Sequence, residues 1–256
     1  MTHVQKLFLI GGVMAVITAA MFIFSGPIPQ PVEYHNFADG RGWLGMPNFG
    51  DVISNLPFTI IGFYGLWVLA NCVATDSWLR DARLPLTVFF IGIVFVGPGS
   101  AYYHWAPDHA SLFWDRIPIT VGFMALTAAV ISDRIAPKWG AQVALPVLVC
   151  LGAGLALHWR LTDDLRAYVL VQILPVIAIP MILWMWPKSD PHQRNWITWP
   201  MILWAMVFYG LAKVTEFADV GVFEMLGGMA SGHSIKHVLA AGVPLVVALK
   251  LDARRH

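Results

Sequence analysis

Charged residues are scarce in this sequence. Only 12% of its 256 residues are Asp, Glu, Lys or Arg, whereas 58% are hydrophobic, and the mean hydropathy is +0.67. A soluble globular domain has about 25% charged residues. The composition therefore excludes an ordinary soluble domain and predicts a polytopic membrane protein.

Basic blocks and clustered cysteines are also missing. The formal net charge is only +1, and no run of lysines and arginines could neutralise a series of phosphates, which excludes nucleic acid as a partner. The two cysteines, Cys72 and Cys150, both lie inside apolar runs. We interpret them as packing residues rather than as a disulfide or a metal site of the CxxC type.

Long apolar runs are abundant instead, and each is long enough to be read as a membrane helix. They are Leu7–Phe24, Val52–Val73, Leu86–His104, Leu112–Ser132, Val143–His158, Tyr168–Trp186, Ile197–Lys213 and His233–Leu251. The first run could be the apolar part of a signal peptide. Its length of about 18 residues and the poor cleavage site at Ser25-Gly26-Pro27 favour a retained span.

The sequence thus predicts an all-α fold, a polytopic membrane helix bundle. We expect an additional N-terminal transmembrane helix in residues 1–26, a non-cytoplasmic loop in residues 27–50 and a seven-helix core in residues 51–256. The loop is rich in Gly and Pro and long for a connector, so we expect it to be ordered over the membrane surface, where it could cap a site.

The basic residues indicate the orientation. If eight helices alternate across the membrane, one side carries Lys6, Arg80, Arg83, Arg134, Lys138, Lys188, Arg194, Lys250, Arg254 and Arg255. The other side carries chiefly Arg41, Arg160 and Arg166. Because cytoplasmic loops are enriched in Lys and Arg, we expect both termini in the cytoplasm.

Two histidines open the last apolar run. His233 and His237 are four residues apart, so on a helix they lie on one face, with Cβ atoms roughly 5–6 Å apart, close enough to share a metal ion. A pair of this kind near a helix end can also be ordinary interfacial polarity, although histidines within a membrane are functional hypotheses by default.

Other polar residues are expected at the same, non-cytoplasmic level. Ser100 and His104 end one run on a single helix face, and Asp115 begins the next run after a short turn. Ser54 and Asn55 begin the second run on that side. Taken singly, the serine could bond to its own backbone, the aspartate could cap its helix and the histidine could be an interfacial ring. Their joint placement favours one site.

This set of residues suits hydrolytic chemistry. Three imidazoles without thiolates, from His104, His233 and His237, suit Zn²⁺ with a fourth position open to water. Zinc lowers the pKa of a bound water toward about 7 and polarises a carbonyl. Asp115 would take the proton of that water and pass it to a leaving nitrogen, and Ser100 would stabilise the oxyanion.

At these residues the sequence resembles the alkaline ceramidases. They belong to a membrane hydrolase superfamily that also includes adiponectin-receptor-like and Per1-type lipid-remodelling proteins. The shared pattern is a Ser-Asn pair, Ser-x-x-x-His, Asp-x-x-Pro-Ile and His-x-x-x-His, each at one end of a core helix. Here these are Ser54-Asn55, Ser100 to His104, Asp115 with Pro118-Ile119, and His233 to His237, and the resemblance spans roughly Asp39 to Ala248.

The resemblance implies a seven-helix core with an intramembrane zinc site that hydrolyses the amide of ceramide, or of a related N-acyl lipid, to a sphingoid base and a fatty acid. His104, His233 and His237 would be the zinc ligands, Asp115 the proton shuttle and Ser100 the oxyanion donor, with Ser54 and Asn55 beside them.

Eukaryotic members carry a calcium site before the first core helix, built from acidic residues, a Trp and an Asn. Here Asp39, Trp43 and Asn48 are the candidates, but their spacing departs from that pattern, so the resemblance supports zinc more firmly than calcium. The additional N-terminal helix makes the chain more similar to a bacterial branch, which implies the bacterial inner membrane.

We therefore expect an integral membrane zinc amidase with a lipid substrate. The alternatives are a lipid-sensing receptor-like or GPI-lipid-remodelling protein of the same superfamily, or a transporter or chromophore protein that uses Lys213. The charges Lys213, Glu216, Asp219 and Glu224 are interpreted as solvated or paired with one another, with headgroup recognition as the alternative. We expect Lys236 to point away from the histidine face, and His35 and His109 to be surface residues.

Overall fold

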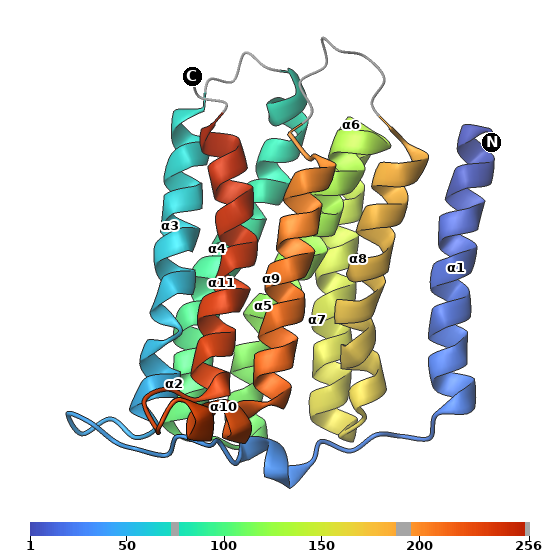
Figure 1. Cartoon of the computed structure of the whole chain (residues 1–256). Coiled ribbons are helices and arrows are strands. Elements are labelled where there is room, and N and C mark those ends of the chain that lie inside the picture. The colour runs from blue at the N-terminus through green and yellow to red at the C-terminus, as the bar shows by residue number, and fades with distance from the viewer. Residues whose placement is uncertain (73–76, 188–195, 254–256) are drawn as a thin grey trace. The chain divides into compact units, whose positions relative to one another are not determined.

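The structure is a computed structural model that describes residues 1–72, 77–187 and 196–253 (Figure 1). The regular secondary structure of the described residues is helical, with one isolated bridge between Trp43 and Met46 in the loop before α2. The long helices are α1 (His3–Phe24), α3 (Leu56–Asn71), α4 (Ser77–Trp105), α5 (His109–Arg134), α7 (Leu145–Thr162), α8 (Leu165–Met185), α9 (Trp199–Phe217) and α11 (Gly232–Asp252). The short ones are η1 (Val32–His35), α2 (Phe49–Ile53), α6 (Pro137–Trp139), η2 (Gly140–Ala144) and α10 (Asp219–Met225).

These helices confirm the expected all-α membrane bundle. Seven spans of the described chain are long and apolar enough to cross a membrane, and an eighth is added if α9 and α10 are counted as one broken span. The axes of α9 and α10 differ in direction by 83°. Four of the basic residues used to orient the chain, Lys188, Arg194, Arg254 and Arg255, lie outside the described residues.

Helix α4 begins earlier than the apolar pattern predicts. The apolar run starts at Leu86, but the helix already includes Arg80 and Arg83. Arginine and alanine are good helix formers, so the polar segment continues the helix beyond its apolar part. Hydropathy marks the segment that suits lipid, and it does not mark where the helical hydrogen bonds begin.

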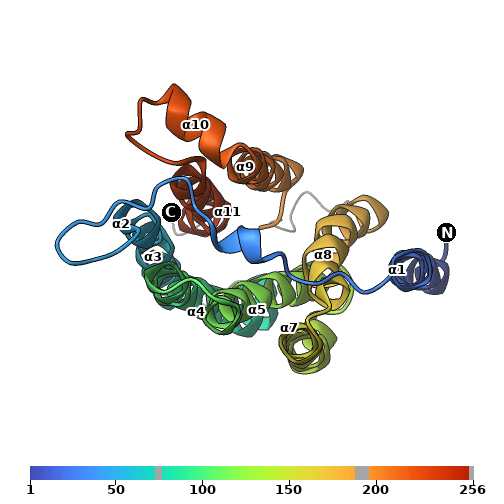
Figure 2. The ribbon, with the colours of Figure 1, turned by 90° about the horizontal axis from the view of Figure 1, so that it is seen from below.

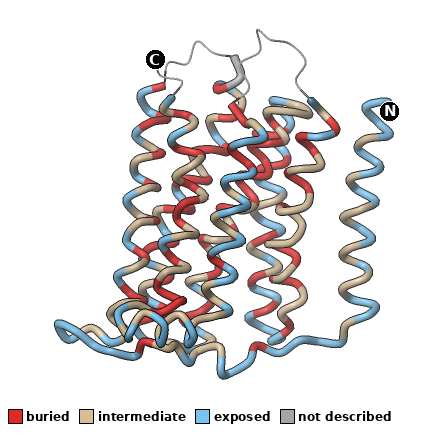
Figure 3. Tube along the Cα trace, in the orientation of Figure 1, coloured by how far each residue is buried: buried red, intermediate tan, exposed pale blue. Residues whose placement is uncertain are grey.

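The chain divides into two compact units. Unit 1 comprises the described residues within 1–30, 74–89 and 120–197, and unit 2 those within 31–73, 90–119 and 198–256. In unit 1, α1 contacts α8, and hydrogen bonds join the two near both ends of α1. Lys6 Nζ donates to the carbonyl of Met185, and Arg166 donates to the carbonyl of Ser25 at 2.6 Å. No residue of α1 is buried, and exposed and intermediate residues alternate along the helix (Figure 3).

Unit 2 is organised around α11. This helix packs against α9 and α3, which lie on two sides of it (Figures 1 and 2). Glycines allow the closest approaches. A Cβ atom on Gly62 of α3 would lie 2.6 Å from the backbone nitrogen of Val94 in α4, and one on Gly242 of α11 would lie 2.5 Å from the ring of Phe208 in α9. Small residues at such positions bring membrane helices into backbone contact.

Replacing Gly62 tests this packing. Gly62→Ala would place a methyl group against the backbone of α4, which cannot move aside as a flexible side chain could. We expect it to lower the free energy of unfolding by about 1–3 kcal/mol, as overpacking does, and to lower the thermal midpoint of the purified protein in detergent. Gly154→Ala in α7, where an added Cβ meets nothing within 4 Å, is the control and should be neutral or stabilising. An unchanged midpoint for Gly62→Ala would contradict the close approach.

Candidate metal centre

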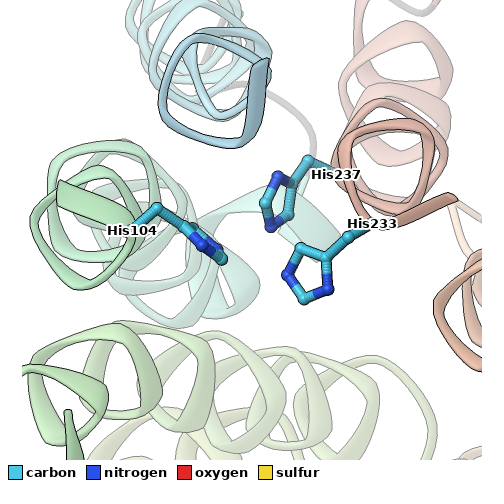
Figure 4. A group of neighbouring side chains, drawn as sticks. All are labelled: His104, His233 and His237. Carbon is cyan, nitrogen blue, oxygen red and sulfur yellow. The ribbon is translucent and has the colours of Figure 1, made fainter. Parts of the chain in front are cut away.

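Three histidines of unit 2 come together at one point. His104, His233 and His237 are buried, and one nitrogen from each lies within 4.8 Å of the others. Their ring centroids are 4.8, 4.8 and 4.9 Å apart, and the three rings point toward one another (Figure 4). Among the described residues this is the one group of three or more His, Cys, Asp or Glu side chains that could hold a metal ion. The structure thus assembles the predicted ligand set.

The first turn of α11 is fixed by side chains from other segments. Ser231 is the N-cap and accepts a hydrogen bond from the backbone N–H of Ser234 at 2.9 Å. The hydroxyls of Ser231 and Ser234 both donate to the same carboxylate oxygen of Asp51, at 3.0 and 2.6 Å. Asp219 accepts from the backbone N–H of His233 at 2.7 Å. These bonds satisfy donors that a helix start leaves open, and they hold the two histidines of α11 in place.

Ser54 determines which nitrogen of His237 is available. Its Oγ lies 3.1 Å from the carbonyl oxygen of Asp51 and 2.8 Å from Nδ1 of His237. A hydroxyl has one proton, so Ser54 donates to the carbonyl and accepts from Nδ1–H. The lone pair of His237 is then on Nε2, which is buried without a hydrogen-bond partner. Asn55 supports the same turn, because its amide donates to the Asp51 carbonyl at 2.7 Å.

His104 also has an unsatisfied nitrogen. Its Nδ1 is buried and has no hydrogen-bond partner, while its carbonyl oxygen accepts from the Asn48 amide at 2.8 Å. Buried polar atoms without partners are rare in folded proteins and often mark the place of an ion or a ligand. Two such nitrogens, on His104 and His237, fit a metal ion held by neutral imidazoles.

Lys236 lies against the histidines. Its Nζ is 2.8 Å from Nε2 of His233 and 3.1 Å from a carboxylate oxygen of Glu216. The expectation that Lys236 points away from the histidine face was wrong. Residues three apart on a helix are neighbours, and long side chains lean toward the preceding turn, so the lysine reaches back to His233.

Ser100 and Asp115 meet where α4 and α5 pack closely. The two side chains form a hydrogen bond, Ser100 is buried and Asp115 is partly buried. A Cβ atom on Gly99 would lie only 2.5 Å from the carbonyl oxygen of Trp114, so the two helices approach backbone to backbone here. Ser100 lies one helical turn before His104, which places the hydroxyl and the carboxyl beside a predicted metal ligand.

The loop before α2 covers two rings of the triad. The ring of Phe37 lies 4.6 Å from the rings of both His104 and His233, measured between centroids. The next residue, Ala38, donates its backbone N–H to Asp219 at 2.9 Å. The loop is therefore bound to the same carboxylate that caps α11. Sequence reasoning missed Phe37, Asp51 and Asp219, because no spacing within the chain relates them to the histidines.

His35 and His109 are more than surface residues. Nδ1 of His35 lies 2.9 Å from the hydroxyl of Tyr103, and its Nε2 lies 3.0 Å from Nδ1 of His109. Partial burial and the neighbouring His109 lower the pKa of His35. A neutral ring can accept one of these hydrogen bonds and donate the other. The hydrogen bonds from Tyr103 through His35 to His109 therefore fix the loop beside the triad.

The three calcium candidates make other contacts. Both oxygens of Asp39 accept from Arg41, at 2.6 and 2.7 Å, and this pairing lowers the pKa of Asp39. Trp43 is exposed, with its ring 4.8 Å from that of Phe49. Asn48 directs its amide nitrogen at the carbonyl of the metal-ligand candidate on α4. The guanidinium of Arg41 thus supplies, at Asp39, the positive charge that calcium would supply in the predicted site.

The charged residues between α9 and α11 were interpreted as solvated or paired with one another, and pairing applies to some of them. Lys213 Nζ lies 2.8 Å from a carboxylate oxygen of Glu216. Asp219 instead accepts two backbone hydrogen bonds, from Ala38 and from His233.

Comparison of the chain with protein-family models and with curated proteins finds no significant match.

Substitution of each histidine tests the metal centre. His104→Ala, His233→Ala and His237→Ala each leave two imidazoles, which are too few to hold a metal against purification. We expect elemental analysis to find one metal ion per chain in the unaltered protein and none in each variant. His158→Ala, at an exposed position of α7, is the control and should keep it. A variant of the triad that retains one metal per chain would remove that histidine from the ligand set.

Ser54→Ala tests the orientation of His237. Loss of the Oγ acceptor leaves Nδ1–H without a partner, and removing a partner that orients a metal ligand typically costs 10–100-fold in metal affinity. We expect a loss of about that size in competition with a chelator. Thr127→Ala, which removes a hydroxyl bonded to the carbonyl of Phe123 in unit 1, should have no effect on metal affinity. Equal affinities for Ser54→Ala and the unaltered protein would contradict the proposed role.

Proposed function

We propose that this chain is an integral membrane, zinc-dependent amidohydrolase of the alkaline ceramidase type. Its substrate is ceramide or another N-acyl lipid, which it cleaves to a sphingoid base and a fatty acid. The observation that carries the proposal is the buried triad of His104, His233 and His237 next to the hydrogen-bonded pair Ser100 and Asp115.

The donor set supports zinc as the metal. Three neutral imidazoles without a thiolate are the ligands of catalytic zinc sites, which keep a further position open, whereas structural zinc sites are closed by four ligands and are rich in cysteine. Bound there, zinc supplies a Lewis acid that polarises a carbonyl and acidifies a water molecule.

Asp115 is the proton carrier in this proposal. Hydrolysis of an amide adds the hydroxyl of water to the acyl carbon and a proton to the leaving nitrogen. The carboxylate of Asp115 accepts the proton from water, and the resulting carboxylic acid returns it to the nitrogen as the C–N bond breaks. A carboxyl group next to an apolar helix interface suits both proton transfers, because it can exist as a carboxylate and as a carboxylic acid.

Ser100 changes partner as Asp115 changes charge. In the structure the two side chains are hydrogen-bonded, and the hydroxyl of Ser100 donates to Asp115 as long as Asp115 is a carboxylate. Once Asp115 has taken a proton, it becomes a donor itself, and the Ser100 O–H is free to turn to the oxyanion of the substrate. The two residues would thus act in sequence rather than independently.

The substrate would be a lipid because the centre is built from membrane-type helices. Ends of four of them, α3, α4, α5 and α11, carry the polar residues of the site. With the excess of basic residues assigned to the cytoplasm, both termini are cytoplasmic and the centre opens to the non-cytoplasmic side. In a bacterial cell this would be the inner membrane.

A Schiff-base role for Lys213 has less support. Its Nζ lies 2.8 Å from Glu216, and an ammonium paired with a carboxylate holds its proton and is a poor nucleophile. We therefore expect the purified protein to be colourless.

Turnover of labelled N-acyl lipids tests the proposal. Purified protein loaded with zinc should release fatty acid from at least one member of a panel of ceramides and related amides. Asp115→Asn should keep its zinc and lose 10²–10⁴-fold in rate, the usual contribution of general acid–base catalysis. Asp81→Asn, on the part of α4 that belongs to unit 1, is the matched control with normal rates.

Two results would oppose the proposal. No turnover across the panel with zinc fully bound would favour a lipid-sensing receptor of the same superfamily. Near-normal turnover by Asp115→Asn would remove this residue from the mechanism while leaving the metal centre intact.

A further inference from the structure

Two lysines share one carboxylate beside the metal centre. Lys236 contacts one oxygen of Glu216 at 3.1 Å, and Lys213 contacts the other at 2.8 Å. The hydroxyl of Tyr34 lies 3.3 Å from the oxygen that Lys236 contacts. Both oxygens of Glu216 are therefore engaged, and two positive charges face one negative charge.

The surplus positive charge lies at the triad. Lys236 also touches Nε2 of His233 at 2.8 Å, so its ammonium is within one contact of a metal-ligand candidate. Asp115, which interacts electrostatically with Lys236, offsets this surplus while it is a carboxylate, and the surplus is complete once Asp115 has taken up a proton in the proposed reaction. A charge among apolar helices is costly without a partner, which favours an anionic ligand here.

The lysines are also accessible from the apolar surface. The side chain of Lys213 is 50% exposed, while those of Glu216 and Lys236 are each 17% exposed. Phe217, four residues after Lys213 and therefore on the same face of α9, is an apolar side chain that is 96% exposed. An ammonium has three donors, and Glu216 takes one of those on Lys213. An anion with a hydrocarbon tail could thus reach Lys213 while its tail stays on the apolar face of α9.

We propose that Lys213 and Lys236 form a subsite for the anionic group of a long-chain amphiphile, a carboxylate or a phosphate, next to the metal centre. The inference rests on the proposed function for what brings the amphiphile there, because hydrolysis of an N-acyl lipid releases a carboxylate at this point. A carboxylate product and an anionic substrate headgroup share the required chemistry. Glu216 holds the two ammonium groups apart and in position when the ligand is absent.

Binding, measured without turnover, tests the subsite. A dansyl-labelled fatty acid with a free carboxylate serves as the probe, and palmitate, hexadecyl phosphate and hexadecylamine are the competitors, matched in chain length. Wild-type protein should prefer at least one of the two anions to the amine by about tenfold or more, as charge-assisted hydrogen bonds predict. Tighter binding of palmitate would assign the subsite to the released fatty acid, and tighter binding of hexadecyl phosphate would assign it to an anionic headgroup.

Lysine variants locate the effect. Lys213→Met should weaken binding of the preferred anion about tenfold and leave hexadecylamine unchanged, whereas Lys213→Arg should retain the preference. Lys236→Met should act in the same direction, with metal content measured in the same sample because Lys236 contacts His233. Lys250→Met, near the other end of α11, should bind like the wild type.

The outcomes separate this inference from the proposed hydrolase. Equal affinity for anions and amine, or unchanged anion binding by a folded Lys213→Met variant, would overturn the subsite even if the lipid panel is hydrolysed. If Lys213→Met does not fold, Lys213→Gln and the preference of the wild-type protein decide the question. Anion preference that depends on Lys213 would stand even if no lipid of the panel is cleaved.

Discussion

Burial of three imidazoles at one point is the constraint on which the rest of unit 2 depends. His104 and His237 each have a buried nitrogen without a hydrogen bond, and such an atom costs about 1–3 kcal/mol unless something else binds it. Asp51 Oδ2 and Asn55 Oδ1 are also buried without a partner, while other residues nearby make specific contacts. Ser54 orients one ring, Asn48 holds the end of α4, and Phe37 packs against two of the rings. The arrangement leaves one nitrogen available on His104 and one on His237, whereas Nε2 of His233 accepts from Lys236.

Two carboxylates connect this centre to the segments around it. Asp51 binds both hydroxyls of the first turn of α11, and Asp219 binds the start of α11 together with the loop at Ala38. Each carboxylate therefore joins pieces of chain that are far apart in sequence. If the loop moved, Phe37 would leave the rings and Asp219 would lose one of its two partners, so the cover and the metal centre are mechanically linked.

The two carboxylates Asp115 and Glu216 have different surroundings, which suit different functions. Asp115 bonds to Ser100 and is placed to carry a proton, while Glu216 bonds to two lysines and is placed to hold positive charge. Carboxylates in such different surroundings suit different tasks, as in enzymes whose paired acids are separated by environment. The same logic connects the proposed chemistry with the proposed anion subsite, since the proposed reaction would release a carboxylate near the triad, which Lys236 contacts.

The sequence by itself determined the membrane bundle, because hydropathy is a property of composition. It also determined that Ser100 shares a helix face with His104, and His233 with His237, because the helical repeat is local. Only the tertiary structure decided that Lys236 turns toward His233, that Asp51 and Asp219 hold α11, and that Phe37 covers the rings. Those contacts join segments through packing and side-chain reach, which no spacing along the chain encodes. The apolar run begins at Leu86 whereas α4 begins at Ser77, because apolar residues mark what lipid favours and backbone hydrogen bonds mark the helix.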